Sequence, residues 1–470
     1  MESAGGPIQE QQLLKQGREL TQQGKYVEAI VVAQQLVALT PKSHAAWSTL
    51  AWLYAQVGRH EDAIPALDKA IALAPQHMHY QARKALALFH LERYTEALAA
   101  FEQAHALDPA VPIQDYHALT LLGLKRYDEA LAAANAILAQ SERSSLAWFV
   151  RGRVYTEKRQ YDEAETSLVR SIELEPTYSK IATLGQLYLY KLRNYTKATV
   201  ISERLLFMAP DRADSWTFNG ALLLAQRNYK DARDSYARAF SRGKLSKSNE
   251  QTAWNNTGIA LLHLGRYGDA MVAFDHADAL IGDRVATIIN RGYILSRLSR
   301  YQQALDYFER AFRINPIQPE AHTNKAFALV QLDRLDEAQA EIEAVLARDP
   351  ENGYAWGAKG MLEARRGQHG AATTALTTAI AHTPEYAPTY AEFARLLLAI
   401  GDTARACAEA DHAVTLEPFD ARAWAMKAQA LRAARRIEEA DAAARHGAAL
   451  LADQQAQVDA YFAAKEQGEQ

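Results

Sequence analysis

The stretch AAWSTLAWLYAQVGRHEDAIPALDKAIALAP, residues 45–75, predicts two short helices joined by a turn. Its first half has apolar side chains at the i, i+3, i+4, i+7 spacing of one helix face. These side chains are Trp47, Leu50, Ala51 and Tyr54. Gly58 interrupts this helix, and Pro75 ends the second one because the residue before a proline avoids the helical region. Two short helices cannot bury their apolar faces alone, so we expect the pair to stack on neighbours.

The same pattern recurs along nearly the whole chain. An alanine returns every 34 residues, except for a step of 33 before Ala130 and a step of 38 before Ala270. The alanines in register are Ala29, Ala63, Ala97, Ala130, Ala164, Ala198, Ala232, Ala270, Ala304, Ala338, Ala372, Ala406 and Ala440. Most units also have a tyrosine three residues before this alanine and a proline twelve residues after it. Repetition at this period predicts a solenoid.

The 34-residue period, with aromatic, small and proline residues at these places, resembles the tetratricopeptide repeat (TPR) family. The second-helix pattern of that family is clear at Phe308, Ala311 and Pro316. The resemblance covers roughly residues 10–454. It implies an all-α fold, a right-handed superhelix (α-solenoid) of stacked antiparallel helix pairs, with about thirteen repeats.

Departures from the repeat suggest how the chain is divided. Residues 1–9 are predicted to be a flexible tail, and residues 10–246 an array of about seven repeats. The polar segment 241–252 adds four residues and lacks the expected proline, so we expect a longer loop or an extended second helix there. Residues 247–453 then form a second array of about six repeats. Residues 454–470 are predicted to be a capping helix and tail, with Val458, Tyr461 and Phe462 on the stripe that covers the last unit.

Composition and motifs exclude several classes of function. The chain contains no phosphate-binding glycine loop, zinc-protease motif or nucleophile elbow, so we expect no catalytic residues and no cofactor. His77 and His79 lie two residues apart, on different sides of a helix, and no metal site is predicted. A net charge of −4 does not favour nucleic-acid binding, and no apolar run is long enough to span a membrane. The single cysteine, Cys407, fits a reducing compartment, so we expect a cytoplasmic protein.

In the TPR family the first helix of each pair lines the concave face of the superhelix. The side of each first helix that the repeat leaves variable should therefore face the groove. The groove residues predicted in this way are Arg153, Asn255, Asn256, Asn290, Tyr293, Arg297, Asn324 and Phe327.

Three of these asparagines, Asn256, Asn290 and Asn324, occupy the same position in successive repeats. Asparagine is a poor residue for a helix interior, but its amide offers both donors and an acceptor to an extended peptide backbone. We interpret the three as a ladder on the concave wall, with Asn255 beside the first. The ladder resembles the asparagine rows of the TPR superhelix that precedes a glycosyltransferase domain in one class of enzyme. The alternative is that the amides bond to neighbouring helices within the array.

These features predict a non-enzymatic scaffold or adaptor that binds an extended or helical segment of a protein or peptide partner in its concave groove. Two alternatives remain open at this point. The chain could be a structural subunit of a multiprotein assembly, or a regulatory arm for a separate enzyme. The sequence leaves the oligomeric state undetermined.

Overall fold

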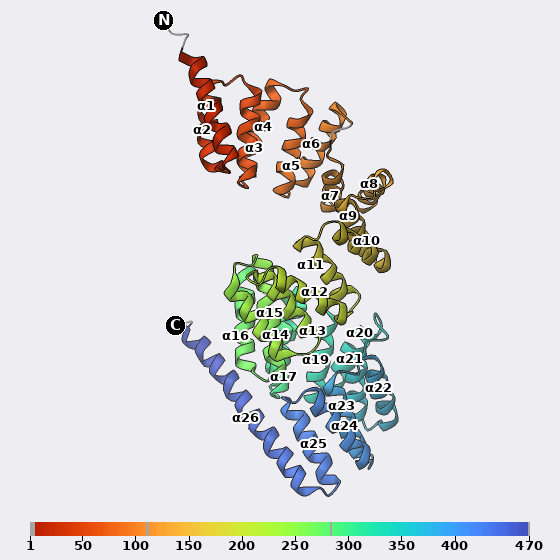
Figure 1. The fold of residues 1–470 in the computed structure, drawn as a ribbon. Coiled ribbons are helices and arrows are strands. Elements are labelled where there is room, and N and C mark those ends of the chain that lie inside the picture. The colour runs from red at the N-terminus through yellow and green to blue at the C-terminus, as the bar shows by residue number, and fades with distance from the viewer. Residues whose placement is uncertain (1–4, 110–111, 283, 469–470) are drawn as a thin grey trace. The chain divides into compact units, whose positions relative to one another are not determined.

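The computed structural model describes residues 5–109, 112–282 and 284–468. These residues form 26 α-helices and one short π-helix, and they contain no strand. Successive helices pair in antiparallel fashion and stack on the next pair (Figure 1). The prediction of an all-α array of stacked antiparallel helix pairs is therefore confirmed.

The chain divides into two compact units, unit 1 (residues 1–201) and unit 2 (residues 202–470). Unit 1 contains α1 (Gly5–Gln22), α2 (Tyr26–Leu39), α3 (His44–Gln56), α4 (His60–Leu73), α5 (Met78–His90), α6 (Tyr94–Leu107), α7 (Gln114–Gly123), α8 (Tyr127–Gln140), α9 (Ser145–Glu157), α10 (Tyr161–Leu174), α11 (Tyr178–Gln186) and the π-helix η1 (Leu187–Lys191). The boundary between the units falls within α12 (Tyr195–Met208).

Unit 2 contains α13 (Ala213–Ala225), α14 (Tyr229–Arg242), α15 (Lys247–His263), α16 (Tyr267–Ile281), α17 (Val285–Arg297), α18 (Tyr301–Ile314), α19 (Pro319–Gln331), α20 (Leu335–Leu346), α21 (Gly353–Arg365), α22 (His369–His382), α23 (Ala387–Ala399), α24 (Thr403–Leu416), α25 (Ala421–Ala433) and α26 (Ile437–Gly468). The predicted division into two arrays at 246/247 differs from this unit boundary and stays a prediction.

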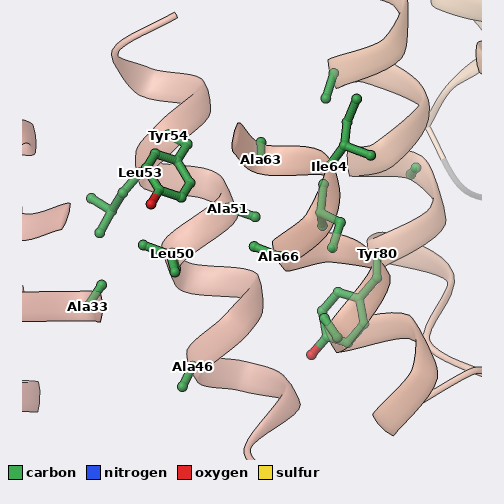
Figure 2. Close-up of a cluster of buried hydrophobic side chains, with 14 of the residues drawn as sticks. Ala33, Ala46, Leu50, Ala51, Leu53, Tyr54, Ala63, Ile64, Ala66 and Tyr80 are labelled. Carbon is green, nitrogen blue, oxygen red and sulfur yellow. The ribbon is translucent and has the colours of Figure 1, made fainter. Parts of the chain in front are cut away.

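The periodic alanines lie where the two helices of each repeat touch. All thirteen of them, from Ala29 to Ala440, are fully buried. Figure 2 shows this packing in unit 1, where Ala51 of α3 faces the alanines of α4, while Leu50 and Leu53 lie on the side of α3 toward Ala33 of α2. A small side chain at this place allows the two helix backbones to approach closely, so the repeat register predicted from the sequence is correct.

Two segments differ from their sequence-based expectation. The four extra residues before Trp254 form neither a long loop nor a longer second helix. They extend the first helix, α15, whose N-terminus is capped by the Ser246 hydroxyl accepting from the Asn249 amide at 3.2 Å. Residues 454–468 are not a separate helix over the last repeat but the continuation of α26. Their apolar stripe packs on α16–α18 instead, where Val458 is fully buried.

Each repeat turns from its first helix to its second through one residue with positive φ. Five of these turns use glycine, as predicted at Gly58, and eight use another residue. A side chain with a β-carbon strains this left-handed conformation by about 1–2 kcal/mol. The non-glycine turns therefore reduce the stability of the fold slightly.

We expect Lys125→Gly to stabilise unit 1 by about 0.5–1 kcal/mol, because Lys125 is exposed and has φ 59°. The measurement is the urea unfolding midpoint. Lys125→Ala is the matched control, since it removes the same side chain but keeps the β-carbon, and it should give no such gain. Equal midpoints for the glycine and alanine variants would contradict the prediction.

Candidate functional site

Unit 2 has an open cavity of about 660 Å³ on its concave side. First helices α15, α17, α19 and α21 form most of its wall, and the turns before α21, α23 and α25 complete it. Four tyrosines and three asparagines give it an aromatic and amide-rich lining: Tyr229, Tyr293, Tyr354, Tyr386, Asn290, Asn324 and Asn352. Cavities of this size commonly hold ligands.

The concave side of unit 2 is bounded by contacts between each of two repeats and the fifth repeat after it. The Arg227 guanidinium, in the turn after α13, donates to the backbone carbonyl of Glu385 at 2.8 Å. In the last repeat, the Gln457 side chain accepts from the Gly268 amide at 3.3 Å, and the Tyr461 hydroxyl donates to Asp275 of α16 at 3.0 Å. Unit 2 is therefore closed along a seam where α26 meets α16 and where the turn before α25 meets the end of α17.

A buried ion cluster lies within this seam. Arg297, at the end of α17, is paired with both Glu417 and Asp420, and Arg422 lies beside Asp420 at 3.5 Å. The side chains of Arg297, Glu417 and Asp420 are only 3%, 8% and 4% exposed. Burial opposes ionisation of Asp420, but the charges of Arg297 and Arg422 outweigh it, so the pKa of Asp420 lies below its ordinary value.

The ion cluster also divides the concave face. Glu417 lines the 660 Å³ cavity, whereas Asp420 and Arg422 line a second cavity of about 250 Å³. The groove is therefore not continuous past Arg297. A chain end or a projecting side chain fits the larger cavity better than a long segment that passes through it.

The sequence-predicted groove residues separate into several environments. Asn290, Tyr293 and Asn324 line the larger cavity, and Phe327 lines the smaller one. Arg297 is buried in the ion cluster. Arg153 lies in unit 1, on α9, with its guanidinium 5.9 Å from the centre of the Phe149 ring.

Asn255 and Asn256 line neither cavity. The Asn256 amide donates to the Tyr236 hydroxyl at 3.0 Å, and the Asn255 amide donates to the Asn256 oxygen at 3.2 Å. The amides of Asn290 and Asn324 have no hydrogen-bond partner in the described part of the chain. Only these two asparagines of the predicted ladder therefore present free amides to the cavity.

His263 forms part of the cavity wall and is stacked on Tyr229, with ring centres 4.3 Å apart. Burial lowers its pKa to about 3, and the positive charges of Arg297 and Arg227 act in the same direction. The Glu417 carboxylate is 3.9 Å from His263 Nδ1, but it is already paired with Arg297. His263 is therefore neutral at pH 7.

We expect unit 2 to lose about 2 kcal/mol of stability between pH 7 and pH 5 through His263. The pKa in the folded state, about 3, lies below the unfolded value of about 6.5. The unfolded chain therefore gains a proton that the folded chain does not, and stability falls as the pH drops below about 6.5. Urea midpoints at the two pH values should show this loss, and His263→Phe should reduce it. An equal loss in the variant would assign the pH dependence to other groups.

Several cavity residues were missed in the sequence. Tyr229 is one of the tyrosines that recur three residues before the periodic alanines, at the start of a second helix, and Glu385 and Tyr386 lie in a turn that an argument from first-helix faces does not cover. The turn residues Asn352, Tyr386 and Asp420 precede successive first helices at the 34-residue period, so their register could have been read from the repeat. Their common position at the inner rim depends on the closure of unit 2.

No group of three or more metal-ligating side chains occurs among the described residues. Within the same residues, no helix is long and apolar enough to cross a membrane.

Comparisons with known proteins give one clear result. One family model, described as tetratricopeptide repeat, matches residues 14–77, 48–112, 117–178 and 219–283. A second model with the same description matches residues 297–362 and 364–430. No curated protein matches the chain.

Among solved structures, the APC/C hetero-tetramer Cut9-Hcn1 is similar with a TM-score of 0.48 and 14% identity, over 90% of this chain and 96% of that chain. A tetratricopeptide repeat protein from Parabacteroides merdae ATCC 43184 is similar with a TM-score of 0.47 and 17% identity, over 54% of this chain and 99% of that chain.

Proposed function

Since the chain belongs to the tetratricopeptide repeat family, we propose that it is a non-enzymatic scaffold that holds a protein partner at the concave side of unit 2. The observation that carries this proposal is the 660 Å³ cavity, into which Asn290 and Asn324 present amides without partners. Such amides can bond to both the N–H and the C=O groups of a peptide. The bound element is a chain end or a short loop of the partner, because the ion cluster at Arg297 interrupts the groove.

The experiment begins with a random peptide library displayed on phage and selected against the full chain. We expect selected peptides to bind Asn290→Ala/Asn324→Ala more weakly by about 0.5–1.5 kcal/mol for each lost hydrogen bond. Stability of this variant should be equal or slightly higher, because alanine is the better helix former. The two effects are measured by binding isotherms and by thermal melts.

Asn256→Ala is the matched control. It removes the bond to the Tyr236 hydroxyl, so it should lower the melting temperature without weakening the peptide. The reverse pattern, with binding lost in Asn256→Ala and kept in the double variant, would place the partner outside the cavity.

A further inference from the structure

The charges around the cavity indicate which side chain of a partner it would accept. Carboxylates outnumber cations on the lining, where Glu320, Glu385 and Glu417 face a single guanidinium, Arg227. Arg297 neutralises Glu417 from behind the wall. No salt bridge joins Glu320 or Glu385 to a cation in the described residues, and both are exposed at the rim. The lining therefore has a net negative charge.

The aromatic part of the lining favours a cation as well. Tyr293 comes from α17, Tyr354 from α21 and Tyr386 from the turn before α23, and the last two meet edge to face with ring centres 4.8 Å apart. Burial raises the pKa of Tyr293 and of Tyr386, so both hydroxyls stay neutral near pH 7. The faces of neutral aromatic rings attract ammonium and guanidinium groups.

The wall already uses this interaction internally. The guanidinium carbon of Arg297 lies 5.0 Å from the centre of the Tyr293 ring. Arg227, the cation on the lining itself, is held at the rim by its bond to the Glu385 carbonyl, which leaves the Glu385 carboxylate unpaired. His263 adds no positive charge, because its pKa is about 3. The lining of the cavity thus contains aromatic faces, its carboxylates without an ion pair lie at the rim, and its nearest cations are already engaged.

We propose that the cavity of unit 2 takes a basic side chain, arginine or lysine, presented by a protein partner. The proposal rests on the function proposed above and adds the chemical class of the group that is recognised. Glu320 and Glu385 bond to the cation at the rim, the tyrosines contact its alkyl stem and its charged head, and the amides of Asn290 and Asn324 bond to the neighbouring backbone.

The test compares two capped residues of the same shape. N-acetyl-arginine methylamide carries a guanidinium, and its citrulline counterpart carries a neutral urea group. We expect the arginine compound to bind the full chain about ten-fold more tightly at low ionic strength, by saturation-transfer NMR titration, and this ratio should shrink in about 0.5 M salt. The corresponding lysine compound should likewise bind more tightly than its neutral norleucine counterpart.

Two charge variants test whether the preference for arginine over citrulline arises from the carboxylates of the cavity. Glu320→Gln/Glu385→Gln should reduce the arginine-to-citrulline ratio to about three-fold or less. Glu343→Gln/Glu351→Gln removes the same number of charges from unit 2 but none from the cavity lining, and should leave the ratio unchanged. Equal binding of the two compounds, no binding of either, or an unchanged ratio in the first variant would overturn the proposal.

These outcomes differ from a failure of the proposed function. If peptides from the library still depend on Asn290 and Asn324 while arginine and citrulline bind equally, the scaffold function stands and the charge preference does not. If the selected peptides ignore both asparagines, the placement of the partner is wrong, whatever the capped residues show.

Discussion

Replacing Arg297 by methionine should destabilise unit 2 by about 3–5 kcal/mol. The change removes one guanidinium from the seam and leaves Glu417 and Asp420 buried with Arg422 as their remaining cation. Desolvated carboxylates without enough positive charge are costly. Urea unfolding of the full chain, with hydrogen exchange resolved at α17 and α25, should place the loss at the seam.

Arg300→Met is the matched control. Arg300 also crosses the seam, to Asp459 of α26, but Asp459 is 64% exposed. A pair open to water contributes about 0–1 kcal/mol, so this variant should change little. Equal effects of the two substitutions would mean that burial of the cluster does not decide its energy.

A second substitution tests the cause more directly. Arg297→Met/Glu417→Leu removes both a buried cation and a buried anion, so it should be more stable than Arg297→Met alone. A double variant that is less stable than the single one would contradict the view that uncompensated charge causes the loss.

Phe308→Ala should also cost about 3–5 kcal/mol, because Phe308 is a fully buried large side chain of unit 2. Its ring packs against Gly292 of the first helix in the same repeat. A β-carbon added at Gly292 would lie 2.6 Å from a Phe308 ring carbon. Gly292→Ala alone should therefore destabilise the protein by about 1–3 kcal/mol through overpacking, partly offset by the better helix propensity of alanine.

The effect of Gly292→Ala on stability should change sign when the Phe308 ring is absent. In the Phe308→Ala background, Gly292→Ala should stabilise by about 1 kcal/mol, since only the helix-propensity gain and some cavity filling remain. A double-mutant cycle from urea unfolding measures the coupling. Gly370→Ala is the control, because nothing lies within 4 Å of its added β-carbon, and it should show no coupling to Phe308. Additive effects of Gly292→Ala and Phe308→Ala would mean that the two residues do not pack as described.

The repeat register was predictable because each repeat touches mainly its neighbours. A buried alanine such as Ala304 needs only the helix pair in which it lies, and the 34-residue period shows where that pair is. The closure of unit 2 was not predictable in this way. Arg297 is separated by 123 residues from Asp420, and nothing in a nearest-neighbour pattern relates them.

The predicted ladder of asparagines shows both what the repeat register can predict and what it cannot. Asn256, Asn290 and Asn324 have the same place in the repeat, but the second helix of the preceding repeat differs. Four residues after the periodic alanine, that helix has Tyr236 before Asn256 and a phenylalanine before each of the other two. The hydroxyl of Tyr236 gives Asn256 an internal partner, and the phenylalanines have none to offer. The sequence shows this difference between tyrosine and phenylalanine, but its consequence follows only once the contact between that residue and the asparagine is known.

The seam that joins α26 to α16, and the turn before α25 to the end of α17, restricts how a chain of this kind can change its length in evolution. An open solenoid can gain or lose a repeat by duplication or deletion, because each new junction reproduces the old one. In unit 2, removal of one repeat between α16 and α26 would bring Asp459 and Tyr461 opposite different residues and would leave Arg297 without its acids. Descendants of this array should therefore vary in repeat number within unit 1 more readily than within unit 2.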